Sequence, residues 1–168
     1  MRIGYIMAPG KGDVDLRLQT LAERLSAGGA RLCGTVQINT ACAGGGPCDM
    51  DVRVRPDGPV LRISQSLGAG ARGCRLDPEA LERAVGLVTA RLGAGADLLI
   101  VNKFGKQEAE GRGFRDAIAE ALTRDVPVLV GLNGANLAAF QSFAEGLATQ
   151  LPPDVDALED WFLAPDRP

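Results

Sequence analysis

The residues best suited to chemistry begin with a glycine-rich loop, Gly10-Lys11-Gly12-Asp13, which follows the first apolar run of the chain. Backbone N–H groups of such a loop, placed at a helix N-terminus, form a cradle for an anion. A phosphate-binding loop of the form G-x-x-x-x-G-K-[ST] also needs a lysine for the β- and γ-phosphates and a hydroxyl for Mg²⁺. Here Asp13 stands at the lysine position, and Val14 and Asp15 stand where the hydroxyl belongs. Two interpretations stay open: an anion-binding loop made by residues 10–13, or a tight strand-to-helix turn with Asp13 as the helix N-cap.

A second polar loop, residues 102–113, follows the apolar run at 97–101, which is typical of a strand buried on both faces. Ligands of open α/β sheets bind at the carboxyl ends of strands, where a nucleotide hydrolase places a Mg²⁺-supporting Asp and a catalytic Glu. This chain has Asn102 and Lys103 instead, with Lys106 beyond them, and we predict that all three bind an anion. The alternative is a solvated charged loop. Because Asp13 is acidic and Lys103 basic where a hydrolase has the reverse, we hypothesise that they face each other across the former nucleotide site.

Amide and thiol side chains supply the remaining candidates. Gln37 and Gln65 lie near expected strand ends and are neutral donors suited to a desolvated oxyanion, or else ordinary surface groups. If Cys48 and Cys74 meet, a soft-ligand contact to a metal or oxyanion becomes feasible, whereas the alternative is buried structural thiols. The cysteine spacings are not C-x-x-C and the chain has no histidine, so we predict no metal site and no catalytic residue.

The elements that must position these residues follow from apolar periodicity and turn residues. Helical spacing from Leu16 to Leu25 is stopped by Gly28, and Asp77 is the expected N-cap of a second helix. We predict strands at 3–7, 31–37, 49–55, 59–65, 97–101 and 126–132, helices at 78–92, 114–122 and 135–147, and a short final helix that ends near residue 161. This order predicts an α/β fold with three layers and a mostly parallel sheet. We expect a single domain over 1–168, with a β-hairpin insertion at about 48–66 and a C-terminal tail at about 150–168.

Composition limits the classes of function. The 168 residues carry 18 basic and 21 acidic side chains, a net charge of -3, and only 4% aromatics, which argues against a nucleic-acid partner. No apolar run is long enough to cross a bilayer, and the start lacks the features of a signal peptide. We therefore expect a cytoplasmic protein with no membrane partner and with reduced thiols.

Five blocks carry a resemblance to a known family; they span residues 34–37, 48–50, 63–65, 73–77 and 102–111. They resemble the bacterial DUF2478 family over nearly the whole chain, and the last block is the most specific. That family is similar to THEP1-type P-loop nucleoside-triphosphatases, which have Asp-Glu-Ile-Gly at the position of Asn102 to Gly105. The resemblance implies a P-loop-NTPase-like fold with degenerate nucleotide-binding motifs. Because DUF2478 proteins are associated with molybdate-transport genes, it also implies a role with molybdenum or tungsten.

These observations favour a non-hydrolysing P-loop-like protein that binds a small oxyanion, molybdate or tungstate, in molybdenum homeostasis. No other cofactor is expected. One alternative is a divergent nucleoside-triphosphatase, in which Lys11 replaces the displaced lysine and Glu108 or Asp13 supports Mg²⁺. The other is a non-catalytic interaction protein whose hairpin forms a homo-oligomer interface, and we expect homo-oligomers.

Overall fold

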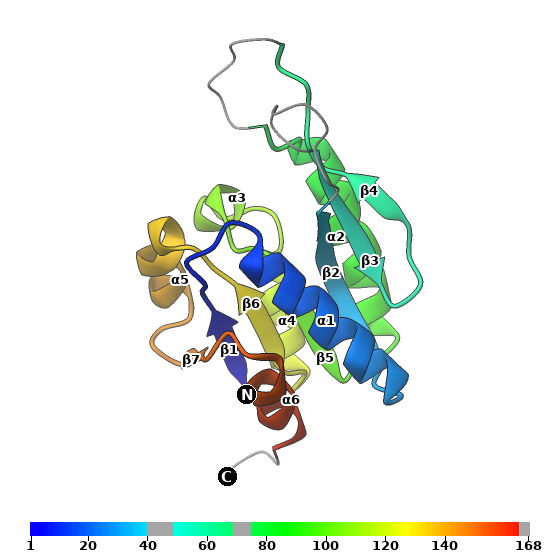
Figure 1. Ribbon diagram of the computed structural model, residues 1–168, viewed down its shortest axis with the longest axis vertical. Helices are drawn as coiled ribbons and strands as arrows, with labels where there is room; N and C mark the ends of the chain where they lie inside the picture. Colours follow the sequence, from blue (N-terminus) through cyan, green and yellow to red (C-terminus); the bar gives the residue numbers. More distant parts are fainter. Residues whose placement is uncertain (40–48, 69–74, 165–168) are drawn as a thin grey trace.

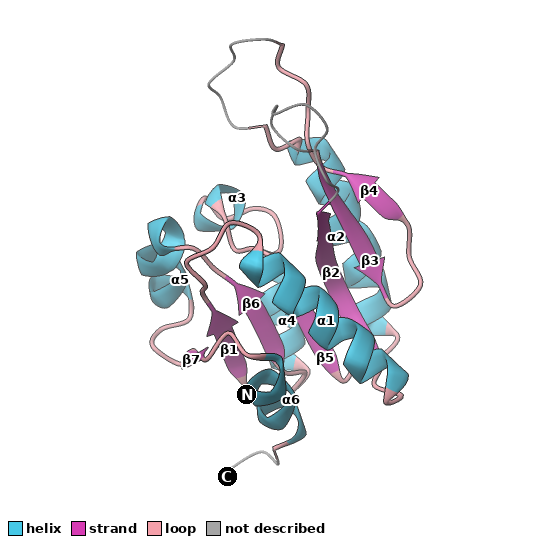
Figure 2. Cartoon of the chain, in the orientation of Figure 1, coloured by secondary structure: helices cyan, strands magenta, loops and turns pink. Residues whose placement is uncertain are grey.

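The computed structural model describes residues 1–39, 49–68 and 75–164. Within these residues seven strands form one sheet in the order β4-β3-β2-β5-β6-β1-β7, with helices on both faces (Figures 1 and 2). The strands are β1 (Ile3–Ile6), β2 (Leu32–Asn39), β3 (Met50–Arg55), β4 (Val60–Arg62), β5 (Leu98–Val101), β6 (Val128–Gly131) and β7 (Thr149–Leu151). The helices are α1 (Asp13–Ala27), α2 (Pro78–Gly93), α3 (Lys106–Ala109), α4 (Arg115–Thr123), α5 (Leu137–Phe143) and α6 (Val155–Leu163), with a 3₁₀ turn η1 (Gly134–Asn136) before α5.

Strand pairing confirms the predicted three-layer α/β fold with a mostly parallel sheet. The five strands β2, β5, β6, β1 and β7 run parallel to one another. Strands β3 and β4 form an antiparallel hairpin that extends the sheet beyond β2. That this hairpin is an insertion stays a prediction.

Two apolar cores hold the layers together. On one face α1 and α6 pack on the sheet through residues such as Leu21 and Leu158, against Ile6, Ile100 and Leu129. On the other face α2, α4 and α5 cover side chains of β1, β3, β5 and β6. Every residue of β1, β5 and β6 is buried, which agrees with strands that alternate their side chains between two covered faces.

The helix starts test two predictions about capping. Asp77 is the N-cap of α2, as predicted, because its carboxylate accepts hydrogen bonds from the backbone N–H groups of Glu79 and Ala80. The prediction that Asp13 caps α1 was wrong. Gly12 is the N-cap, with a φ of 82° that favours glycine, and Asp13 is the first helical residue and makes no side-chain capping bond.

Three other elements differ from the sequence-based prediction. The expected loop at 102–113 contains the short helix α3, and the helix expected to reach residue 147 ends at Phe143. Strand β7 was not predicted at all. Its three residues include one buried side chain, Leu151, so there is no apolar alternation to detect, and pairing with β1 alone makes it a strand.

Candidate functional site

Three loops meet at the carboxyl edge of the central strands, where ligands of such sheets bind. They follow β1, β5 and β6, and β6 lies between the other two strands. Backbone hydrogen bonds extend this order beyond the strands: Phe104 N donates to Gly131 O at 2.9 Å, and Leu132 N donates to Ile6 O at 3.0 Å. The sheet therefore places the glycine loop and the Asn102–Lys106 loop on either side of the β6 loop.

The side chain of Asp13 partly fills the glycine loop, residues 10–13. Asp13 N donates to Gly10 O at 3.2 Å, and the Asp13 carboxylate folds back so closely that a Cβ on Gly10 would lie 2.1 Å from Asp13 Oδ2. Next to it, Val14 packs its Cγ1 methyl toward the backbone of Gly131. An anion that enters this loop meets a carboxylate, and the position expected for a Mg²⁺-binding hydroxyl presents a methyl group.

Asn102 ties together three elements at the centre of this edge. It is 3% exposed; its Nδ2 donates to Asp15 Oδ1 at 2.9 Å, and its Oδ1 accepts from the backbone N–H of Gln37 at 2.8 Å. A Cβ at Gly131 would lie 2.0 Å from Asn102 O, so only glycine fits against this turn. The structure thus brings two predicted site residues, Gln37 and Asn102, together, and it engages the Asn102 amide inside the protein.

All three lysines of the sequence lie in these loops: Lys11, Lys103 and Lys106. Every one is exposed, and Lys106 Nζ lies 3.7 Å from Glu110 Oε1. Lys103 stands between the buried side chains of Asn102 and Phe104. Asp13 and Lys103 do not form an ion pair, so the charge relationship hypothesised from the sequence is not realised as a contact. The link between their loops runs instead through the neighbouring residues 15 and 102.

Glu108 holds the second loop in shape. The side chain is 2% exposed; Oε2 accepts from Gly105 N at 2.8 Å and Oε1 accepts from Phe114 N at 3.0 Å. Phe104, fully buried, packs edge-on against Phe140 with ring centroids 5.2 Å apart. Both Glu108 oxygens thus accept backbone donors in the interior. The nucleoside-triphosphatase alternative gave Mg²⁺ support to Glu108 or Asp13, and of these two residues Glu108 is buried within its own loop.

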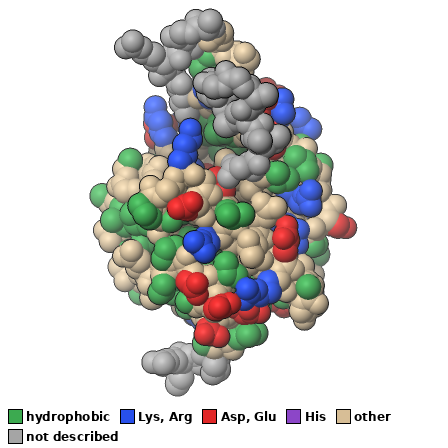
Figure 3. All heavy atoms as spheres, in the orientation of Figure 1, with side chains coloured by type: hydrophobic (Ala, Val, Ile, Leu, Met, Phe, Trp, Pro, Cys, Tyr) green, Lys and Arg blue, Asp and Glu red, His purple; other side chains and the backbone are tan. Residues whose placement is uncertain are grey.

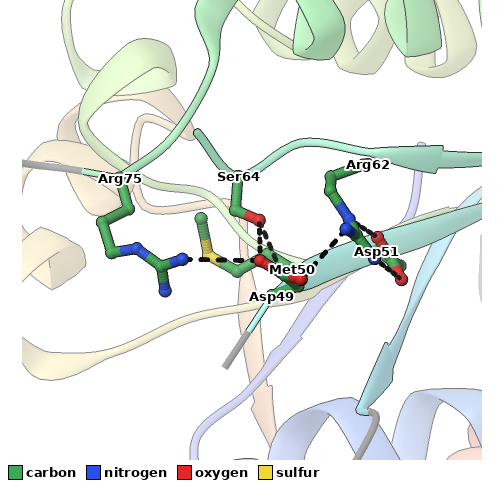
Figure 4. Close-up of polar contacts among 6 residues, drawn as sticks. All are labelled: Asp49, Met50, Asp51, Arg62, Ser64 and Arg75. Carbon is green, nitrogen blue, oxygen red and sulfur yellow. Dashed lines mark hydrogen bonds and ion pairs between the residues drawn. The ribbon is translucent and has the colours of Figure 1, made fainter. Parts of the chain in front are cut away.

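Gln65 follows a separate polar cluster in the chain, and its Nε2 donates to Leu76 O at 3.1 Å. In that cluster Ser64, Arg62 and Arg75 surround the Asp49 carboxylate (Figure 4). Arg62 Nη1 lies 3.0 Å from Asp49 Oδ2, and Arg75 Nη2 lies 3.5 Å from Asp49 Oδ1. No contact in the described part of the chain connects Gln65 to the lysine loops. The cluster joins the described residues that border 40–48 and 69–74.

The predicted thiol contacts lie outside the described residues, because these exclude Cys48 and Cys74. Cys33 is described; its Sγ donates to Val88 O at 3.3 Å, and burial raises the pKa of this thiol to about 11. Within residues 1–39, 49–68 and 75–164, no group of three or more acidic, His or Cys side chains could hold a metal ion. Among the same residues, no helix is both long and apolar enough to cross a membrane.

Sequence reasoning missed two features of this edge. The sequence shows that all lysines of the chain lie in these two loops. Only the order of the strands in the sheet shows that the two loops meet. Asn133 and Asn136, after β6, could not be assigned from periodicity; Asn133 Oδ1 accepts from Asn136 Nδ2 at 3.0 Å and keeps the β6 loop closed.

The strand order and the helices on both faces of the sheet define a three-layer α/β protein. A solved structure titled "Solution Structure of a Human Cancer-Related Nucleoside Triphosphatase" matches with a TM-score of 0.61 and 20% identity, covering 89% of this chain and 87% of that one, which shows the shared fold. The model of the family described as "Protein of unknown function (DUF2478)" matches residues 3–161, so the chain belongs to that family.

A curated protein is similar to this chain in sequence. The chain is 34% identical over 161 residues to "Molybdenum import ATP-binding protein ModC 2" of Bradyrhizobium diazoefficiens. The match covers 96% of this chain and 18% of that protein, so the chain spans less than a fifth of the relative's length.

Proposed function

We propose that this chain is a P-loop-like protein that binds a small tetrahedral oxyanion, molybdate or tungstate, and does not hydrolyse nucleotides. The observation that carries the proposal is the placement of the chain's three lysines, Lys11, Lys103 and Lys106, at one edge of the sheet. All other basic side chains are arginines. A lysine is a compact point charge that suits an anion with spread charge and no planar face. The relative named for molybdenum import supports molybdate as the anion.

The absence of hydrolysis is supported by three positions. Asp13 presents a carboxylate where the phosphate-loop lysine is needed, Val14 presents a methyl group, and Asn102 uses its amide on Asp15 and Gln37. Phosphoryl transfer depends on positioned positive charge and a metal at the transferred group. None of these three side chains supplies either.

The oxyanion is proposed to lie between the lysines rather than inside the glycine loop, because Asp13 folds over Gly10. Lys103 is presented by a turn whose neighbours are anchored, since Phe104 is fully buried and Glu108 holds Gly105 N. The backbone that carries Lys103 is therefore ordered before the anion binds, which lowers the entropy cost of ordering this loop. Lys11 and Lys103 form no ion pair with the described residues, and their two positive charges match the double charge of molybdate.

A melting and labelling experiment tests the proposal. Purified protein is melted with molybdate, tungstate, sulfate, phosphate or Mg-ATP; a ligand at a hundred times its Kd adds about 2.7 kcal/mol of stability. We expect a shift with molybdate or tungstate that Lys103→Gln and Lys11→Gln weaken and Arg83→Gln, an exposed site on α2, does not. Acetylation of amines, read by mass spectrometry, should show Lys11 and Lys103 protected by molybdate while the N-terminal amine is not.

The outcomes separate the alternatives. A shift with Mg-ATP alone, followed by nucleotide turnover, overturns the proposal and favours the divergent nucleoside-triphosphatase. An equal shift with sulfate shows a site for any tetrahedral dianion and removes the specificity for molybdenum or tungsten. If no ligand shifts the melting and none protects the lysines, the oxyanion site is wrong.

A further inference from the structure

On one face of the β3–β4 hairpin, α1 contacts Arg55 at the end of β3, and the described apolar core beneath α1 and α6 does not extend onto the hairpin. The core under α1 and α6 contains side chains of β1, β2, β5, β6 and β7, and none from the described residues of β3 or β4. The opposite face of the hairpin is covered, since Val52, Val54 and Ile63 belong to the core under α2. Beyond Arg55 the hairpin extends past α1, at the right of Figure 1, so this part of the sheet surface is exposed.

The strand register shows which side chains lie on this face of the hairpin. Alternate residues of β3 share a face, and Arg53 pairs with Val60 while Asp51 pairs with Arg62. We call Asp51, Arg53, Arg55, Val60 and Arg62 the β3–β4 face. Arg62 is compensated by ion pairs to Asp51 and Asp49 at 3.0 Å. Arg53 makes no ion pair within the described residues, and Val60 is 48% exposed although apolar.

Arg55 is the unusual member of the face. It is 9% exposed and its Nη2 donates to Ser26 Oγ and to Ala22 O, both neutral acceptors on α1. Its Nε is the buried side-chain nitrogen that finds no partner among the described residues. Burial and the nearby charge of Arg53 lower the pKa of Arg55, and the carboxylate of Glu23 offsets part of this effect. A buried charge that has no ion pair among the described residues is costly, so a carboxylate brought to this site would stabilise it.

A small hollow lies beside this guanidinium. It is lined by Gln19, Glu23, Val36, Ile38, Arg53 and Arg55. Its volume of about 10 Å³ admits one water molecule or one carboxylate oxygen, which is far too little for molybdate. Glu23 is engaged with Gln19 Nε2 at 3.2 Å and is exposed, so it offsets part of the two arginine charges. The hollow fits the tip of an acidic side chain.

A matching acidic surface exists on the same side of the molecule. On α6, Asp156 and Asp160 are exposed and lie one turn apart, an arrangement of like charges that weakens a helix. Arg24 pairs with Asp156 and Glu159 but not with Asp160, which has no ion pair among the described residues. Figure 3 shows acidic side chains gathered over α6 at the lower part of this face, and basic side chains over the hairpin.

We propose that a second copy of this chain docks on the β3–β4 face, with the partner's Asp156 and Asp160 opposite Arg53 and Arg55. A two-fold axis lies in the plane of such an interface, so a face that is basic at one end and acidic at the other is complementary to itself. Each copy then supplies a carboxylate to the Arg55 of the other copy. The exposed Val60 of each copy is covered as well. Charge complementarity selects this occupant.

Sedimentation velocity across the micromolar range, with the full chain, tests the dimer. We expect a dimer that Arg53→Glu weakens about tenfold or more in dissociation constant, because the change sets like charges opposite each other. The double variant Arg53→Glu with Asp160→Arg should restore dimerisation, because the acidic and basic side chains exchange positions and attract each other again. The matched control Arg83→Glu, on the opposite face of the sheet, should leave the dissociation constant unchanged.

Each other result overturns the proposal. If the protein is a monomer at all concentrations, a second copy does not bind the β3–β4 face, and an acidic segment of another protein becomes the candidate partner. A dimer that Arg53→Glu does not weaken uses a different surface. A dimer lost in Arg53→Glu but not recovered in the double variant shows that Asp160 is not the counterpart; near-identical melting of the variants as monomers separates this result from misfolding. The lysine site and this face lie on different elements, so loss of dimerisation with intact oxyanion binding leaves the proposed function standing.

Discussion

Asn102 donates a 2.9 Å hydrogen bond from Nδ2 to Asp15 Oδ1 and fastens the end of β5 to the first turn of α1. The same amide accepts from Gln37 N, so one buried side chain connects β5, α1 and β2. A neutral amide and a carboxylate thus occupy the junction where a hydrolase would gather metal ligands. The neutral amide of Asn102 therefore stabilises this junction, whereas a hydrolase would place a carboxylate there.

Asn102→Asp should destabilise the protein most at high pH. The introduced carboxyl would face Asp15 at hydrogen-bonding distance, and two carboxylates sharing a site raise one pKa. Its folded pKa then exceeds its unfolded value, so the stability lost at neutral pH returns as pH falls through the raised pKa. Urea unfolding at pH 8 and pH 5 should show a larger loss at pH 8. Gln141→Glu, exposed on α5, is the control and should show equal, small losses at both values.

Glu108→Ala should cost about 3 kcal/mol, because the backbone N–H groups of Gly105 and Phe114 lose their buried acceptor. Denaturant unfolding measures the change, and limited proteolysis should show earlier cleavage within 102–113. Glu110→Ala removes only exposed ion pairs to Lys106 and Arg112 and should cost less than about 1 kcal/mol. Equal losses in the two variants would contradict the bracing role of Glu108.

Asp97 should contribute stability that disappears in acid. Arg31 donates to its carboxylate from both the guanidinium and the backbone N–H, and these bonds hold the pKa of Asp97 below its ordinary 3.8. The contribution is therefore full above that ordinary value and is lost as pH falls through the lower folded pKa. Asp97→Asn should be about 0.5 kcal/mol less stable at pH 7, a small figure because the pair is exposed. The two proteins should converge in unfolding free energy as pH falls below the folded pKa; a constant gap would count against the ion pair.

Cys33 should resist thiol reagents at pH 8 in the native protein. Its raised pKa of about 11 and its 1% exposure both keep the reactive thiolate scarce. Peptide mapping after labelling should find Cys33 modified only when the protein is unfolded first. Labelling of Cys48 and Cys74 with and without tungstate, in the same experiment, tests the predicted soft-ligand contact, which protection by tungstate would support.

The sequence by itself determined the layers of this protein and the residue types that stand in its loops. Apolar runs such as Leu98–Val101 specify strands buried on both faces, and Asp77 specifies a helix start, because both signals depend on neighbours a few residues away. The replacements at Asp13, Val14 and Asn102 are likewise readable without a structure.

Only the tertiary structure decided what those replacements do. Asn102 meets Asp15 and Gln37 across 87 and 65 residues of chain, and the orphan Nε of Arg55 depends on α1 packing beside β3. Asp13 turns back over Gly10 because Gly12 adopts a left-handed conformation at the helix entry. Such contacts depend on strand order and helix placement, which arise from packing of the whole chain and leave no periodic signal in the sequence near any one residue.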